Sequence, residues 1–245
     1  GTWGGIFTML HEGGHGRYNY SSSQRAIDCG LWGGLRGSMH EGQARFYENI
    51  IGKSPEFWQI AYPVVLRHFP QLKQVPLEKF YMALMKVTPS VHRITADELT
   101  YSLHPILRFE MEKDWFDGKT KTKDFQEIWN AKYQEAFGLM PKDAREGVLQ
   151  DIHWASGHVG YFQSYTLGNL YGGMLLEAME QDIPQWEQQM AKGEFSAING
   201  WLHEHVHQYG MAIPPQQLLR QVTGKDLTEE PFLHYLRRRY LTKLR

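Results

Sequence analysis

Two histidines and an acid lie at metal-binding spacing near the start of the chain. His11, Glu12 and His15 form the pattern His-Glu-x-x-His. On an α-helix, residues four apart share one face, so both imidazoles can reach one cation while Glu12 faces a water bound to it. This geometry suits hydrolysis at zinc. A catalytic zinc ion takes three protein ligands and keeps a fourth position for water, so a third ligand must come from elsewhere in the chain.

Glu41 is the predicted third ligand. It lies in the segment 38–45, which has the pattern of a second helix, and a polar, glycine-rich stretch over 19–37 joins this helix to the first. Two antiparallel helices would place Glu41 beside the histidine pair. Arg45 follows one turn later, where it could hold the second oxygen of this carboxylate or a neighbouring acid, as outer-shell groups usually do.

The two glycines inside the metal motif need a reason, because each costs roughly 1 kcal/mol in a helix relative to alanine. One interpretation is that a substrate backbone passes closely over Gly13 and Gly14. The other is tight packing against a neighbouring helix. The sequence favours neither.

A second His-Glu-x-x-His pattern occurs at His203, Glu204 and His207. The acids that follow it lie beyond the pair Pro214-Pro215 and lack a helical partner segment like the one around Glu41. We therefore interpret the second pattern as a surface or packing helix, on the known false-positive risk of the motif.

Composition indicates a globular protein and excludes several classes. The 245 residues, 42% of them hydrophobic, are enough for one domain with a core. A formal charge of -1 disfavours nucleic acid as a partner. No window approaches the roughly 20 apolar residues that span a bilayer, and no targeting segment is visible. The single cysteine, Cys29, fits a reducing compartment, so the cytoplasm is expected.

Apolar residues recur at helical spacing along most of the chain. One predicted helix covers 123–137 and ends at Gly138, and another covers the C-terminal stretch from about 228, with Thr228 as its N-cap. The best strand candidate is the short run 91–95. We therefore predict one all-α domain over residues 1–245, with at most a small β-hairpin.

The segment 95–114 is predicted to be an amphipathic helix. Thr95 and Glu98 fit a capping box, and Pro105 is expected to kink the helix. Four residues form its apolar face, namely Leu99, Leu103, Ile106 and Leu107. The opposite face carries Tyr101, His104 and Arg108, which would either line a groove or form a solvated surface.

Further motifs give the chain a resemblance to a known family. They comprise Arg-Ile-Thr-Ala-Asp-Glu-Leu-Thr-Tyr-Ser-Leu-His over 93–104, Arg-Phe-Glu over 108–110, Gln-Asp-Ile-His-Trp over 150–154, and Gly-Tyr-Phe-Gln-Ser-Tyr-Thr-Leu-Gly-Asn over 160–169. Together with the two metal-binding segments, they make the chain similar to M32 metallocarboxypeptidases of the carboxypeptidase Taq type. The resemblance covers essentially the whole sequence.

This resemblance implies a fold, an activity and a set of site residues. The fold would be an all-helical gluzincin with a deep groove and a zinc or cobalt ion. The activity would be stepwise release of C-terminal amino acids by a homodimer. His11, His15 and Glu41 match the family's metal ligands, and Glu12 matches its general acid/base. The residues in groove-lining motifs are Arg93, Arg108, His153, Tyr161 and Tyr165.

Specific roles follow for these groove residues. Tyr165, with Tyr161 as the next choice, is expected to stabilise the oxyanion that forms during peptide hydrolysis, although an aromatic core stripe is the alternative for this pair. Arg93 and Arg108 are the candidates for binding the terminal carboxylate of the substrate. His104 and His153 are further candidates for substrate contact, with buried, hydrogen-bonded histidine as the alternative for His153.

The chain also departs from the family pattern. The family has an upstream helical region with His-Pro-Phe and Asp-x-Arg-x-Thr motifs, and this sequence contains neither. The chain therefore resembles a C-terminal catalytic half. Two alternatives to a zinc carboxypeptidase stay open, namely a catalytically silent metal-binding half-domain that needs an N-terminal partner and an oligopeptidase with an open groove.

Overall fold

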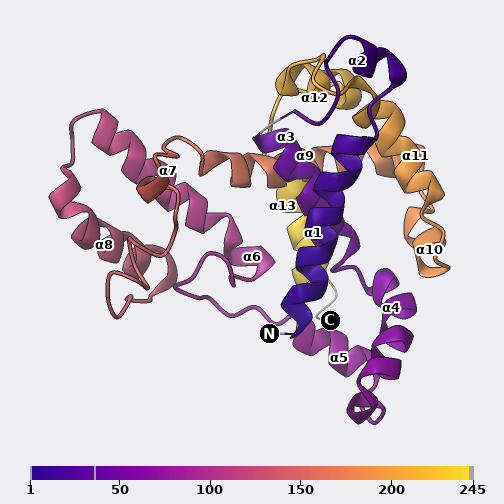
Figure 1. Ribbon diagram of the computed structural model, residues 1–245. Helices are drawn as coiled ribbons and strands as arrows, with labels where there is room; N and C mark the ends of the chain where they lie inside the picture. Colours follow the sequence, from indigo (N-terminus) through magenta and orange to yellow (C-terminus); the bar gives the residue numbers. More distant parts are fainter. Residues whose placement is uncertain (1, 36, 243–245) are drawn as a thin grey trace. The chain divides into compact units, whose positions relative to one another are not determined.

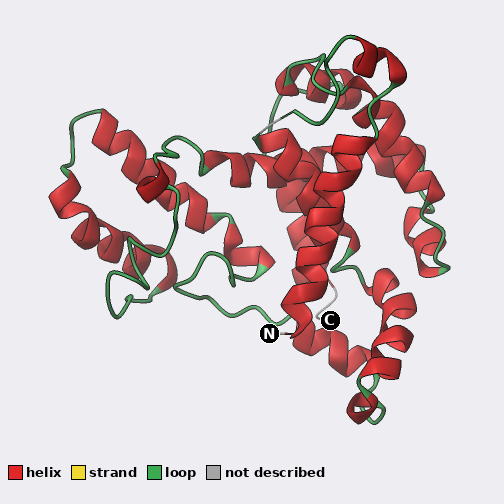
Figure 2. Cartoon of the chain, viewed as in Figure 1, coloured by secondary structure: helices red, strands yellow, loops and turns green. Residues whose placement is uncertain are grey.

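The protein is built from helices and loops. A computed structural model describes residues 2–35 and 37–242, and within these ranges it contains no strand (Figure 2). The predicted all-α class is thereby confirmed. The strand expected over 91–95 was wrong, because this segment is irregular and contains a turn. Among the described residues, no helix combines the length and apolar character that crossing a membrane would require.

The described α-helices follow the chain in order. They are α1 (Thr2–Tyr20), α2 (Gln24–Asp28), α3 (Ser38–Arg45), α4 (Pro55–His68), α5 (Leu77–Leu84), α6 (Glu98–Tyr101), α7 (Leu103–Phe116), α8 (Phe125–Phe137), α9 (Gln163–Asp182), α10 (Trp186–Ala191), α11 (Ser196–His205), α12 (Pro215–Thr223) and α13 (Glu230–Arg237). Wider π-helical turns, η1 (Phe46–Ile51) and η6 (Arg238–Thr242), continue α3 and α13. The remaining short helices are 3₁₀ turns.

These helices belong to two compact units. The first unit contains residues 1–85 and 167–245, and the second contains residues 86–166. The boundary falls inside α9, whose first turn belongs to the second unit. The single catalytic domain expected over 1–245 stays a prediction.

In the first unit, α1 packs against α3 and η1, as seen for the indigo and violet ribbons in Figure 1. The contacts run in opposite order along the two segments. The ring of Tyr18 contacts that of His40, Gly14 lies against Ala44, and the side chain of Leu10 reaches Gly52. The helices are therefore antiparallel, as predicted.

The two glycines of the metal motif differ in their surroundings. A Cβ added at Gly14 would lie 2.8 Å from both the Ala44 Cα and the Gln43 carbonyl oxygen, whereas one added at Gly13 would meet nothing within 4 Å. Packing against the neighbouring helix therefore explains Gly14. Gly13 is exposed, so the substrate interpretation stays open for that position alone.

An aromatic cluster supports the N-terminal part of α1. Its buried members are Trp58, Tyr62, Val65 and Phe80, and Trp3 and Phe7 are among the residues packed against it. The helix α4 that carries Trp58 begins at Pro55, where the Ser54 hydroxyl accepts a hydrogen bond from the Phe57 amide. This is an N-cap followed by proline in the first turn, which is a common way to begin a helix.

In the second unit, the predicted helix over 95–114 is two helices. Asp97, and not Thr95, caps α6, because its carboxylate accepts from the Thr100 amide at 2.9 Å. The break falls at Ser102, close to the kink expected at Pro105. Proline has no N–H to donate to the carbonyl four residues earlier, here that of Tyr101, so the helix is interrupted there.

The faces of α6 and α7 are reversed relative to the sequence prediction. Tyr101, His104 and Arg108 are buried, and the last two are completely inaccessible. Three residues of the predicted core face are instead exposed, namely Leu99, Leu103 and Ile106. The solvated surface considered for the polar face was therefore wrong, because those side chains find hydrogen-bonding partners inside the second unit.

We predict opposite effects of alanine at the two neighbouring glycines of α1. Gly14→Ala should lower the free energy of unfolding by roughly 1–3 kcal/mol, because the added methyl group overpacks the contact with α3. Gly13→Ala is the matched control and should leave stability unchanged or raise it by up to about 1 kcal/mol. Urea denaturation of both variants measures the difference. Equal stability of the two would contradict the packing role of Gly14.

Candidate metal centre

Three side chains from two antiparallel helices converge in the first unit. His11 and His15 project from α1, and Glu41 projects from α3. One donor atom from each residue lies within 4.8 Å of the other two, and in the described part of the chain this is the one group of histidines, cysteines and acids that meets that condition. The three ligands predicted from spacing therefore lie together.

The separations fit a common ion. The Nε2 atoms of His11 and His15 each lie 3.8 Å from Oε2 of Glu41. Two ligand atoms that are both about 2.1 Å from one ion can be up to about 4.2 Å apart, so these pairs can share a cation. Glu41 is 5% exposed and the histidines are half-buried, so a bound ion would be held beside a protein wall.

Acidic and basic side chains surround the outer edges of His11 and Glu41. Glu48 accepts a hydrogen bond from His11 Nδ1 at 2.9 Å. Arg45 donates from Nε to Glu41 Oε1 at 2.9 Å and places Nη1 3.1 Å from Glu48 Oε2. The expectation that Arg45 holds the second oxygen of Glu41 agrees with this geometry, and Arg45 reaches a neighbouring acid as well.

A second set of contacts surrounds His15. Its Nδ1 lies 2.5 Å from Nδ1 of His40, and Nε2 of His40 lies 2.9 Å from Oδ1 of Asn19. His15 therefore presents Nε2 towards Glu41 while its other ring nitrogen is bound to the protein. His11 is arranged in the same way, with Nδ1 bound to Glu48 and Nε2 facing Glu41.

The electrostatic surroundings differ between the two histidines. Burial disfavours the charged form of His11, but the hydrogen bond to Glu48 and the charges of Glu41 and Glu48 outweigh it, so the pKa of His11 is raised. Burial, together with the charge of His11, lowers the pKa of His15. Burial would raise the pKa of Glu48, but Arg45 and the hydrogen bond from His11 lower it to about 2. Glu48 is therefore an anion at neutral pH.

Helix α9 supports Glu41 from another side. A Cβ added at Gly168 would lie 2.9 Å from the Gly42 amide nitrogen and 3.0 Å from Cγ of Glu41. Only a glycine at 168 allows this approach without displacing its neighbours. The side chain of Glu41 is thus confined by α9 as well as by Arg45.

The second His-Glu-x-x-His pattern does not form a comparable group. Helix α11 ends at His205, so His203 and His207 do not lie on one continuous α-helix. His203 is exposed, whereas His207 is fully buried and its Nε2 lies 2.8 Å from Oε1 of Gln43. Its burial lowers the pKa of His207 to about 3. The predicted surface or packing helix is therefore present only in part: the helix ends before His207, with His203 on its surface and His207 packed in the core.

The second unit gathers the arginines that the sequence singled out. Asp151 accepts hydrogen bonds from Arg93, at 2.8 Å and 3.0 Å, and from Arg108, at 2.7 Å. Arg108 also donates to the Tyr133 hydroxyl, which lies 2.9 Å from His104 Nδ1. The charges of the two arginines outweigh burial and lower the pKa of Asp151.

The remaining predicted groove residues lie in the same unit and contact each other. The Tyr165 hydroxyl is 2.9 Å from His153 Nε2, and the Arg93 guanidinium lies 4.6 Å from the centre of the Tyr165 ring. The ring of Tyr161 lies 5.7 Å from that of His153. Tyr161 precedes α9, whereas Tyr165 lies on it, so the two tyrosines do not share one helix face.

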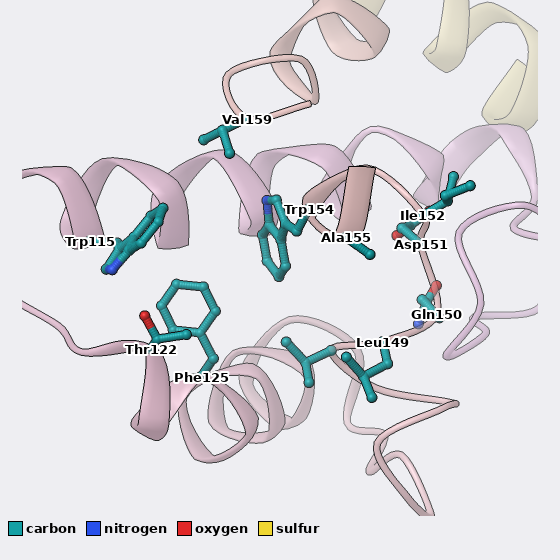
Figure 3. Close-up of a pocket in the computed structure, with 11 residues that line it drawn as sticks. Trp115, Thr122, Phe125, Leu149, Gln150, Asp151, Ile152, Trp154, Ala155 and Val159 are labelled. Carbon is teal, nitrogen blue, oxygen red and sulfur yellow. The ribbon is translucent and has the colours of Figure 1, made fainter. Parts of the chain in front are cut away.

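A cavity of about 650 Å³ also lies in the second unit, between α7, the start of α8 and the segment 148–159 (Figure 3). Its wall is mainly apolar, with Trp115, Phe125 and Trp154 among the lining residues. Asp151 is its one carboxylate, and that group is already bound by two arginines. None of the three predicted metal ligands lines this cavity.

Comparison with known proteins decides the family. Residues 2–240 match the sequence model of the carboxypeptidase Taq (M32) metallopeptidases. The chain belongs to this family. It is 38% identical over 236 residues to thermostable carboxypeptidase 1 of Pyrococcus furiosus and 39% identical over 241 residues to that of Thermus thermophilus. An M32 carboxypeptidase structure from Deinococcus radiodurans matches with a TM-score of 0.93 and 38% identity.

The M32 chain spans about half the length of these relatives. The alignments cover 96% of this chain but 47% of the Pyrococcus protein, 46% of the Thermus protein and 48% of the Deinococcus chain. The resemblance inferred from the motifs is confirmed, including its placement in the C-terminal half of the family sequence. A metal site is in keeping with membership of a metallopeptidase family.

Two residues that surround the candidate metal centre were not predicted from the sequence, namely Glu48 and His40. Glu48 received no role, although it follows Arg45 by three residues and Glu41 by seven, a spacing that puts all three near one face of a helix. His40 was quoted in a motif without a function. Its contact with His15 depends on the packing of two helices, so no local pattern could have indicated it.

The burial of His207 predicts a specific dependence of stability on pH. Its folded pKa of about 3 lies below the unfolded value of 6.5, so its contribution to stability is complete above pH 6.5 and is lost as pH falls from there towards 3. Between pH 7.5 and pH 5, His207→Gln should lose about 2 kcal/mol less stability than the unmodified chain.

Urea denaturation at the two pH values measures this difference. His203→Gln is the matched control, since it removes an exposed histidine of the same motif and should keep the original dependence on pH. An unchanged dependence in His207→Gln would show that the buried imidazole is not neutral in the fold.

Proposed function

We propose that this chain is the catalytic half of a zinc-dependent metallocarboxypeptidase. The observation that carries the proposal is the convergence of His11, His15 and Glu41, with 3.8 Å between each imidazole Nε2 and the carboxylate. Two imidazoles and one carboxylate are typical of catalytic zinc, and cobalt accepts the same donors. Calcium and magnesium prefer sites made of oxygen atoms alone.

Glu12 is the proposed general acid/base. Zinc in such a site polarises the substrate carbonyl and lowers the pKa of its water to about 7. Glu12 is exposed and follows His11 on α1, so its carboxylate can take a proton from the attacking water and return it to the leaving amine. Glu12 is not one of the three proposed metal ligands, so its carboxylate remains available to carry that proton.

The residues of the second unit are proposed to bind the substrate. Arg93 and Arg108 share the single carboxylate of Asp151, so this hydrogen-bonded group carries one uncompensated positive charge. The terminal carboxylate of a peptide would balance it, which favours a substrate with a free C-terminus. Arg108 is completely buried, so Arg93 is the better choice for direct contact and Arg108 for holding Asp151.

The proposed roles of the other groove residues depend on their hydrogen bonds. Tyr165 is the proposed donor to the oxyanion, and His153 Nε2, 2.9 Å from its hydroxyl, would orient it. Tyr161, which is partly exposed, and His153 are proposed to contact substrate. His104 is completely buried against Tyr133, so its proposed contribution to substrate binding passes through Arg108. A cytoplasmic homodimer is our expectation for the whole protein.

The coverage of about half of each relative favours one alternative. This half could bind metal and yet need an N-terminal partner for catalysis. The measurement that separates the two possibilities is hydrolysis of an N-blocked dipeptide by the 245-residue chain loaded with zinc. Turnover supports an active half, whereas stoichiometric zinc without turnover supports the silent half-domain.

We predict that Glu41 is needed to bind metal, whereas Glu12 is needed for catalysis but not for metal binding. Glu41→Ala should lose stoichiometric zinc, because one of three ligands is removed. Glu12→Gln should keep zinc but hydrolyse the blocked dipeptide about 10²–10⁴-fold more slowly, because the proton acceptor is lost. Metal analysis after dialysis and initial rates measure both properties.

His203→Gln is the control for this experiment and should retain both zinc and activity. Apo-state denaturation establishes that each variant is folded. Full zinc content in Glu41→Ala, together with an unchanged rate in Glu12→Gln, would rule out the proposed site.

We also predict selectivity for a free C-terminus. The unmodified chain should cleave a blocked dipeptide acid and reject its amide. Arg93→Met should lower kcat/KM for the acid by about 10–100-fold, the loss expected for a hydrogen bond between charged groups. The ratio of acid to amide rates is the measurement, since a general loss of folding reduces both rates alike.

Arg237→Met supplies the control, because Arg237 is an exposed arginine near the C-terminus. It should preserve the acid-to-amide ratio. Equal cleavage of acid and amide by the unmodified chain would instead favour the oligopeptidase alternative.

A further inference from the structure

Each histidine of the candidate metal centre has its second ring nitrogen bound to a particular protein group. We propose that Glu48 and His40 are positioning residues that fix the tautomer and ring orientation of His11 and His15. This inference rests on the proposed metal-binding role of the two histidines. It assigns to Glu48 and His40 a function in metal affinity and not only in folding.

The argument for Glu48 begins with its partners, because Arg45 Nη1 lies 3.1 Å from its Oε2 and forms an ion pair with it. An ionised carboxylate only accepts hydrogen bonds, and Glu48 Oε2 lies 2.9 Å from His11 Nδ1. The proton of a neutral His11 must therefore sit on Nδ1. The lone pair is left on Nε2, which is the atom 3.8 Å from Glu41. A carboxylate in this place also makes the imidazole a stronger ligand.

The argument for His40 begins at Asn19. The Oδ1 atom of Asn19 accepts a hydrogen bond from the Gly34 amide at 3.2 Å, which identifies it as the oxygen of the side chain. It also lies 2.9 Å from His40 Nε2, so that nitrogen must carry the proton. The Nδ1 atom of a neutral His40 is then an acceptor.

The direction of the next hydrogen bond follows. Nδ1 of His40 accepts from Nδ1–H of His15, 2.5 Å away. The lone pair of His15 is therefore on Nε2, which also lies 3.8 Å from Glu41. The series from Gly34 through Asn19 and His40 thus gives His15 the same tautomer that Glu48 gives His11.

Arg45 links Glu48 to the third ligand. Its Nε donates to Glu41 Oε1, and its Nη1 lies 3.1 Å from Glu48 Oε2. Oε2 of Glu41 is the oxygen that faces both histidines. One guanidinium therefore orients a ligand carboxylate and the acceptor for another ligand. The outer contacts form one connected set. Removing a single acceptor should therefore weaken metal binding.

The test compares variants of similar size that keep or lose the acceptor. Glu48→Leu and His40→Leu remove it. Glu48→Gln keeps an amide oxygen near the place of Oε2, and His40→Asn keeps one near the place of Nδ1. Zinc affinity of each full chain is measured by competition with a chelator. The visible absorption spectrum of the Co²⁺-loaded chain reports the ligand geometry, and urea denaturation reports apo-state stability.

We expect the leucine variants to bind zinc about 10–100-fold more weakly and to show an altered Co²⁺ spectrum. The Gln and Asn variants should recover a substantial part of the affinity and the original spectrum. Glu204→Leu and His203→Leu are matched controls from the exposed part of the second motif, and both should bind zinc as tightly as the unmodified chain.

The outcomes distinguish this inference from the proposed function. Absence of stoichiometric zinc in the unmodified chain would overturn both. Normal zinc binding by the unmodified chain, with unchanged affinity and Co²⁺ spectrum in both leucine variants, would overturn the positioning role alone. A fall in apo-state stability without a fall in zinc affinity would make Glu48 and His40 structural residues and would equally overturn it.

Discussion

The close approach of α1 to α3 is the constraint on which the candidate metal centre depends. Gly14 allows it, because any side chain there would meet the backbone of Gln43 and Ala44. A similar contact exists on another side of α3, where Gly168 of α9 lies against Gly42 and Glu41. Contacts of this kind leave little room for a helix to shift, since protein interiors are closely packed. Glu41 is thus held by the backbones around it before any metal is considered.

The packing places two carboxylates and one arginine around two imidazoles. With neutral histidines, Glu41, Glu48 and Arg45 carry one excess negative charge in a partly buried site. Buried charge is costly unless it is compensated. In the apo chain a proton on His11 lessens the imbalance, in keeping with its raised pKa. A divalent cation would take the place of that proton, so the same charges that favour protonated His11 also favour metal.

In the second unit, the group formed by Arg93, Arg108 and Asp151 has the opposite imbalance. Arg93 and Arg108 are bound to one carboxylate, and the charge of Arg108 also helps to lower the pKa of His104 to about 3, after burial itself. The burial of this group explains why the sequence pattern predicted the wrong buried face for α7. Helical periodicity assigns buried positions by hydrophobicity, but Arg108 is buried because Asp151, 43 residues away, accepts its hydrogen bond and Trp129 lies against its guanidinium. Such compensation cannot be seen in a local pattern.

What could be predicted from the sequence was therefore local, or was linked to a known family. The spacing of His11 and His15, the helix ending at Gly138 and the all-α class belong to this group. The capping of α6 by Asp97, the burial of Arg108 and the contact of His40 with His15 depend on tertiary packing. Glu48 depends on both local sequence and tertiary packing. Its spacing from Glu41 and Arg45 put it on the correct face, but only the approach of α1 makes it an acceptor for His11.

The two His-Glu-x-x-His patterns also differ because of the structure around them. The pattern specifies residue types and a spacing, and it presupposes a helix that continues through the second histidine. At His11 and His15 the helix α1 continues to Tyr20, so both imidazoles face α3. At His203 and His207 the helix ends at His205, and the backbone of Val206 leaves helical geometry with φ −128° and ψ −59°. The second histidine, His207, turns into the core and contacts Gln43, which lies two residues after Glu41 on α3. A histidine that could have bound metal instead helps to position α3, so the second motif contributes to the site by packing.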